Sequence, residues 1–155
     1  MTIRKSQLPL RLDADSAPAV SWQDGMRLAY LGGSLRLQLD TDRERAAREA
    51  DVLHLPLPPD ASPRQIQDAA EAWLRREAGQ VLQDISQRIA ASLCIPAPTL
   101  QLSFASRTDW VRRDGHGLRC NWRLIEQPLA VIDQLLLREI GAMAQPSMAG
   151  DLFAA

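Results

Sequence analysis

One segment constrains the fold of this chain more than any other: a run of about thirty residues, starting at Pro63, with the periodicity of an amphipathic helix. Ser62 and Gln65 form a capping-box pattern at its start, and Pro63 takes the first helical position, where a missing N–H does no harm. The apolar stripe consists of Ile66, Ala70, Trp73, Leu74, Val81, Ile85, Ile89 and Leu93. The prolines that follow, at positions 96 and 98, predict that the helix stops before Cys94.

Three segments before this helix alternate apolar and polar residues and predict β-strands. Gly32–Gly33 suits a tight hairpin turn between the first two, and Pro56 favours an edge or an end of the third. The charged stretch 40–50 predicts a solvated loop or a short turn of helix, because its charges alternate in sign. We expect the strands to form a small antiparallel meander. Their ranges are 26–30, 34–39 and 52–57.

After the long helix, segments 99–104 and 117–124 alternate again and predict two further strands. Residues 106–117 read as a polar loop with a turn at Asp114–Gly115, and a second helix is expected over about 128–143. Because strands and helices are partly segregated along the chain, the pattern indicates an α+β fold rather than a wound parallel sheet.

Length and charge bound the domain count and the partners. The chain has 155 residues and a formal net charge of -1, which suits one domain and gives no electrostatic reason to expect nucleic acid or a membrane surface. We expect an N-terminal arm over 1–25 and a single domain over 26–155. Cys94 and Cys120 make no disulfide framework or zinc-knuckle spacing, so reduced thiols are expected. With no signal-peptide pattern at the N-terminus, we expect a cytoplasmic protein.

Several short motifs, in this order, are similar to those of one family. They are the hairpin Tyr30–Gly32, the segment Leu57–Pro63, the helical segment Ala72–Ala78, part of an Arg-Thr-Arg-Trp-Gly-Ser-Cys motif at Arg107–Trp110, and Asn121–Leu124. From about Met26 to Phe153 they resemble the YgjP-like metallopeptidase domain, a family of metal-dependent hydrolases in the zincin group that is related to SprT-like proteins. The resemblance implies a zincin-like fold: a small meander, the long helix, further strands and then a metal-binding helix.

The resemblance places that metal-binding helix at Leu135–Met143. In the family it carries His-Glu-x-x-His, in which two imidazoles four residues apart bind zinc and the glutamate activates a water molecule. Here the glutamate is kept as Glu139, whereas the two histidine positions read Arg138 and Ala142. The family's third histidine position falls on Met148. The framework is therefore present while the three ligand positions have changed.

These replacements predict that no zinc cofactor is bound. Arg138 brings a permanent positive charge, and Ala142 has no lone pair to give. Met148 offers a soft thioether, which is a poor zinc ligand without thiolate or imidazole help. We interpret Glu139 as a vestigial carboxylate, paired with an arginine or reaching solvent, and leave open a residual role as a general base.

Four residues are candidates for binding in a cleft beside the 118–124 strand: Arg138, Trp110, Asn121 and Arg123. The Arg138 guanidinium suits a carboxylate or phosphate, its own neighbour Glu139 included. A strand of this kind can pair with an extended peptide by β-augmentation. The basic residues near Trp110 fit a solvated loop better than a nucleic-acid patch, because the overall charge is close to zero.

His54 and His116 are the only histidines, and a replacement metal site would have to bring them together with Cys94 or Cys120. The leading hypothesis is a degenerate family member that has lost its zinc ligands and acts without catalysis, by binding a peptide or protein. The alternative is an active metal-dependent hydrolase with Glu139 as base or ligand and non-family ligands. A purely structural or regulatory partner that uses an exposed face is a third reading.

Overall fold

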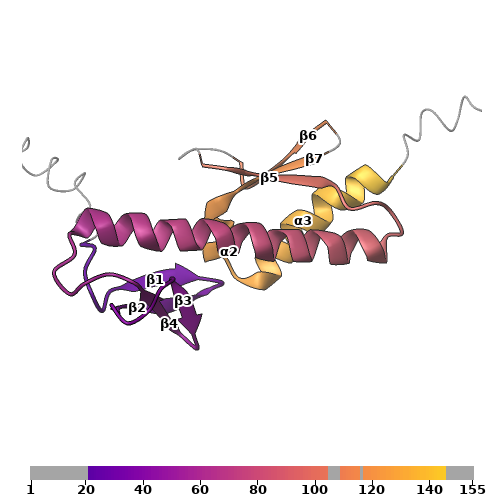
Figure 1. The fold of residues 1–155 in the computed structure, drawn as a ribbon. Helices are drawn as coiled ribbons and strands as arrows, with labels where there is room; N and C mark the ends of the chain where they lie inside the picture. The colour runs from indigo at the N-terminus through magenta and orange to yellow at the C-terminus, as the bar shows by residue number, and fades with distance from the viewer. Residues whose placement is uncertain (1–20, 105–108, 116, 146–155) are drawn as a thin grey trace, which may run out of the picture.

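The computed structural model describes residues 21–104, 109–115 and 117–145, and it confirms the predicted α+β class (Figure 1). A long helix runs across the middle of the molecule, with one sheet on either side of it (Figure 1). The elements in chain order are β1 (Arg27–Tyr30), β2 (Gly33–Leu39), β3 (Ala47–Glu49), β4 (Val52–Leu55), α2 (Pro63–Ser92), β5 (Thr99–Ser103), β6 (Val111–Asp114), β7 (Gly117–Asn121), the 3₁₀ helix η1 (Trp122–Glu126) and α3 (Leu129–Ala144).

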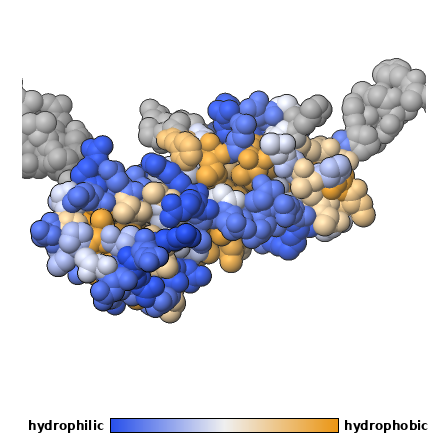
Figure 2. Space-filling model, in the orientation of Figure 1, coloured by the Kyte–Doolittle hydropathy of each residue, from blue (hydrophilic) through white to orange (hydrophobic). Residues whose placement is uncertain are grey.

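The long helix α2 begins and ends where its local sequence predicts. Ser62 and Gln65 close a reciprocal capping box: the Gln65 N–H donates to Ser62 Oγ at 3.1 Å, and the Ser62 N–H donates to Gln65 Oε1 at 2.8 Å. Ser92 is the last helical residue, and Cys94 follows with a positive φ of 58°. In Figure 2 the outward face of α2 is largely hydrophilic, and an apolar area lies over the second sheet. The helix therefore packs between the sheets with its apolar side and meets water with the other.

The first sheet has the strand order β1-β2-β4-β3, so the predicted antiparallel meander is wrong in one respect: β2 and β4 run parallel. The reason is β3, a three-residue strand within the stretch that the charge pattern assigned to a loop or helical turn. It pairs antiparallel with β4, reverses the chain and thereby aligns β4 with β2. The hairpin turn also lies one residue earlier than Gly32–Gly33, because Gly33 already pairs with Tyr30. Pro56 follows the end of β4, as expected.

The second sheet has the order β5-β7-β6, with β5 parallel and β6 antiparallel to β7. Strand β6 was not predicted: it lies inside the segment read as a polar loop, although the turn at Asp114–Gly115 is present. The predicted 117–124 strand is too long. It ends at Asn121, whose side-chain oxygen accepts a hydrogen bond from the Arg123 N–H at 2.9 Å and caps η1. Strand β7 is paired on both sides. The expected addition of a peptide to this strand is therefore wrong.

Helix α3 covers the predicted second helix to within a residue at each end. Ile132, Leu136 and Ile140 are fully buried and lie four residues apart, so they form the face that packs into the core. Trp73 of the predicted apolar stripe is buried, and so is Trp122. No helix in the described part of the chain is long and apolar enough to cross a membrane.

Candidate functional site

Helix α3 carries an ion-pair cluster at the border of its buried stripe, next to the edge strand β6. Glu139 Oε2 lies 3.3 Å from Arg113 Nε of β6, and Glu139 Oε1 lies 4.0 Å from Arg138 Nε of the same helix. The Glu139 side chain is only 19% exposed, whereas that of Arg138 is 71% exposed. One carboxylate therefore stands between two guanidinium groups, and the cluster carries a net charge of +1. We call these three residues the arginine–glutamate cluster.

Arg113 is the member of this cluster that sequence reasoning missed. The sequence showed it only as one of several exposed arginines in a presumed loop, 26 positions from Glu139. Strand β6 brings it to α3 because the β6–β7 hairpin folds back over that helix. The expectation that Glu139 pairs with an arginine is met by this contact, yet no local spacing in the sequence identified which arginine.

The remaining cleft candidates form a second group, linked through the backbone. The Asn121 N–H donates to the Trp110 carbonyl at 2.9 Å, and the Arg123 N–H donates to the Asn121 side chain. Trp110 is 40% exposed, while Asn121 is buried. The Arg123 side chain extends to Glu126 at 3.0 Å, on the side of the first sheet. The structure thus brings Trp110, Asn121 and Arg123 together as a backbone-linked group, and Arg138 belongs to the arginine–glutamate cluster.

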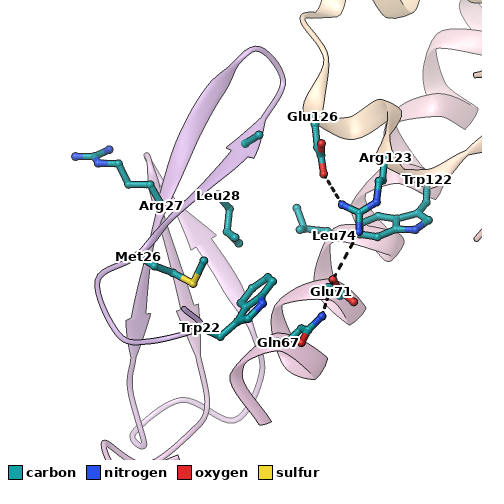
Figure 3. Close-up of a pocket in the computed structure, with 11 residues that line it drawn as sticks. Trp22, Met26, Arg27, Leu28, Gln67, Glu71, Leu74, Trp122, Arg123 and Glu126 are labelled. Carbon is teal, nitrogen blue, oxygen red and sulfur yellow. Dashed lines mark hydrogen bonds and ion pairs between the residues drawn. The ribbon is translucent and has the colours of Figure 1, made fainter. Parts of the chain in front are cut away.

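A cavity of about 500 Å³ lies between β1, α2 and η1, and Arg123 is the predicted binding residue that lines it (Figure 3). Sequence reasoning missed this cavity, since its walls come from segments about fifty residues apart in the chain. Its residues are Trp22, Met26, Arg27, Leu28, Ala29, Gln67, Glu71, Leu74, Trp122, Arg123 and Glu126.

His54 lies in β4 and is flanked by two carboxylates. Its Nδ1 is 3.7 Å from Asp40, its Nε2 is 3.6 Å from Glu49, and Arg43 bonds both carboxylates, at 3.2 and 2.6 Å. Because the two carboxylates stand at opposite ends of the imidazole, the three groups do not converge on one point. In the described residues no group of three or more His, Cys, Asp or Glu side chains could hold a metal ion. His116 lies outside those residues.

Comparison with known protein families identifies the family to which this fold belongs. The model of the YgjP-like metallopeptidase domain matches residues 2–140, which is most of the chain. The chain belongs to the YgjP-like family. The match begins before the Met26 boundary suggested by the motifs and ends within α3. The mixed fold of two sheets and two main helices is that of a small zincin-like domain. No curated protein and no solved structure was found to match the chain.

Proposed function

We propose that this protein is a non-catalytic member of the YgjP-like family, in which an ion-pair cluster stands where the family holds zinc. The observation that carries the proposal is the geometry at Glu139, whose two carboxylate oxygens face Arg113 and Arg138. A carboxylate held in this way is already engaged by two cations. The family's motif uses the same glutamate to activate a metal-bound water, and that use needs the carboxylate oxygens free.

The residues at the family's ligand positions do not fit a zinc ion. Arg138 extends a guanidinium, which has no lone pair for a metal and repels it. Ala142 offers only a methyl group, and it is exposed on the same side of α3. Met148, the third position, lies outside the described residues. Zinc therefore supplies no step of the function that we propose.

The role that the second sheet supports best is binding an extended peptide. In the described part of that sheet, β6 pairs with β7 only, so its other edge is free to pair. The Asn121 N–H bonds the Trp110 carbonyl, so by strand alternation Val111 and Arg113 point their backbone groups away from β7. A peptide that adds along this edge lies beside the arginine–glutamate cluster, whose exposed Arg138 suits a peptide carboxylate.

Metal content and hydrolysis test the loss of catalysis. Purified wild-type protein is expected to hold far less than one zinc per chain and to cleave casein no faster in zinc than in chelator. The triple variant R138H/A142H/M148H restores three imidazoles and is expected to take up about one zinc per chain. The control R138A removes the guanidinium without adding an imidazole, so it should stay metal-free. Stoichiometric zinc in the wild type, or chelator-sensitive cleavage abolished by E139Q, would establish the active hydrolase instead.

Two substitutions of Arg113 test whether a peptide pairs with the outer edge of β6. Twelve-residue peptides enriched from a random display library on the wild-type protein are measured against R113A and R113P. Both variants lose the Arg113–Glu139 contact, but only R113P loses the outward N–H, at an edge position where proline is tolerated. Peptides that bind R113A and lose at least tenfold in affinity for R113P support edge pairing. Equal affinity for the two variants would exclude it.

A further inference from the structure

The edge strand β6 presents different side chains on its two faces. On the face toward α3, Val111 is buried and Arg113 reaches Glu139. Because side chains alternate along a strand, every second residue points to the opposite face of the sheet, and all three residues of that set are exposed. We call them the outer row of β6. They are Trp110, Arg112 and Asp114.

The backbone of β6 determines how a peptide at its outer edge meets this row. The Asn121 N–H donates to the Trp110 carbonyl, and the register with β7 gives every second residue of β6 the same type of pair. A peptide on the outer edge therefore bonds Val111 and Arg113, and its residues opposite the outer row form the non-hydrogen-bonded pairs of an antiparallel ladder. These are the closer pairs, with Cα atoms about 4.5 Å apart rather than about 5.5 Å. Each member of the outer row thus contacts one peptide side chain.

Arg112, at the centre of the outer row, carries a positive charge without a counter-ion. Its guanidinium forms no ion pair or hydrogen bond within the part of the chain that the structure describes. The residue directly opposite it on β7 is Arg119, and like charges in directly opposite positions repel. Arg119 is itself engaged by Asp114 at 3.5 Å and Gln101 at 3.4 Å. A peptide carboxylate opposite Arg112 would supply the missing negative charge.

The two ends of the outer row favour different chemistry. Trp110 is 40% exposed, and its indole offers a flat apolar surface that an aromatic side chain can cover. The side chain of Asp114 is 58% exposed, and its one ion pair among the described residues, to Arg119, is 3.5 Å long. A basic side chain opposite Asp114 would therefore form a second, closer pair. Aromatic pairs and opposite charges are the cross-strand neighbours that stabilise a sheet.

We propose that the outer edge of β6 selects peptides with an acidic residue opposite Arg112, an aromatic residue opposite Trp110 and a basic residue opposite Asp114. Antiparallel pairing is the more stable of the two ladders per residue, and in it the peptide reads basic-x-acidic-x-aromatic from its N-terminus. This inference rests on the peptide binding proposed above and adds a sequence preference to it.

Two peptides of identical composition test the preference: acetyl-Thr-Lys-Val-Glu-Val-Trp-Thr-amide and its charge-swapped form, acetyl-Thr-Glu-Val-Lys-Val-Trp-Thr-amide. In calorimetric titration of the full chain, the first should bind about tenfold more tightly, and the difference should shrink in high salt. In R112Q the preference should fall to about threefold, because only the Asp114 contact still distinguishes the two peptides. The control R36Q removes an exposed arginine from the first sheet and should leave the preference within twofold of the wild type.

A further pair of measurements tests the aromatic position. Replacing the tryptophan of the first peptide by alanine should weaken binding at least threefold in the wild type and hardly at all in W110A. The backbone carbonyl at position 110 still accepts from Asn121 in this variant, so the strand is kept.

The possible failures can be told apart with the two Arg113 variants. Equal affinity of the wild type for the two charge-swapped peptides, a full preference in R112Q, or tighter binding of the reversed sequence acetyl-Thr-Trp-Val-Glu-Val-Lys-Thr-amide would each overturn the inference. If R113P still binds the first peptide at least tenfold more weakly than R113A, edge pairing itself stands. Equal affinity of R113A and R113P, or no binding to the wild type, would overturn the preference and the peptide edge together.

Discussion

Cys120 makes the stability of the fold depend on pH in a way that one substitution can isolate. The residue lies in β7, the central strand of the second sheet, and is fully buried. Burial raises the pKa of its thiol from an ordinary 9 to about 12, because the thiolate would lie away from water. The raised pKa means that the folded state keeps the proton while the unfolded chain releases it. The stabilisation is therefore complete below pH 9 and is lost as the pH rises toward 12.

The size of the loss follows from these two pKa values. Between pH 8 and pH 10 the free energy of unfolding should fall by about 1.3 kcal/mol through Cys120 alone. For a chain of this size the urea midpoint would move by roughly 0.6–0.9 M over that interval. Urea unfolding at pH 8, 9 and 10 in a phosphine reductant measures it. In C120A this part of the pH dependence should vanish. The free energy of unfolding should also be lower by about 1 kcal/mol at every pH, because the sulfur contacts are missing.

The matched control is Cys94, which is exposed at the end of α2. C94A leaves the buried Cys120 in place, so it should keep the pH dependence that this thiol gives the wild type. Thiol titration at pH 8 should count one fast-reacting group in the folded protein and two in urea. A C120A variant that loses stability between pH 8 and 10 as steeply as the wild type would refute the burial argument, as would a flat profile in C94A.

Three further predictions test local features of the fold. In S62A the capping box is lost, and the free energy of unfolding measured in urea should fall by about 1 kcal/mol. Tyr30 is the only tyrosine, and its pKa is raised to about 12, mainly by burial and next by its hydrogen bond to Glu77. Phenolate absorbance should therefore titrate near pH 12 in the folded protein and near pH 10 in urea. The stability that the Tyr30 hydroxyl contributes should be lost as the pH rises from 10 to 12. Gly25 and Gly32 both have φ above +80°, but a Cβ at Gly32 would lie 3.0 Å from Pro128, so G32A should lower the thermal midpoint more than G25A, whose Cβ meets open space.

The sequence predicted α2 well because its information is local. The capping box, the proline at the first turn and the apolar spacing all act within a few residues of one another. By contrast, β6 was missed because it is a short edge strand whose exposed residues are charged, and such strands lack apolar alternation. The 117–124 strand was overextended, because Trp122 and Leu124 continue a two-residue alternation while the backbone turns at the Asn121 cap.

The candidate sites depend on contacts that a single chain pattern does not carry. Glu139 was identified as the family's glutamate, but its partner Arg113 reaches it only through the β6–β7 hairpin. The parallel pairing of β2 with β4 followed from an unforeseen third strand. Likewise, Glu71 reads as an ordinary residue of the polar face of α2, and only the approach of η1 and the first sheet turns it into a cavity wall.

The packing of α3 explains how the chain could lose its zinc ligands, as we propose that it did, and still keep its fold. The helix is fixed by Ile132, Leu136 and Ile140, which are buried whatever occupies the opposite face. Arg138 and Ala142 lie on exposed positions, so replacing histidines there removes no core contact. Further support comes from the backbone, where the Leu31 and Gly32 N–H groups bond the carbonyls at the end of η1, at 2.7 and 3.1 Å, and tie the first sheet to the start of α3. A metal that once bound at this face would have added stability to a helix already held in place. Its loss would therefore end the chemistry and leave a framework able to present β6 and the arginine–glutamate cluster to a peptide.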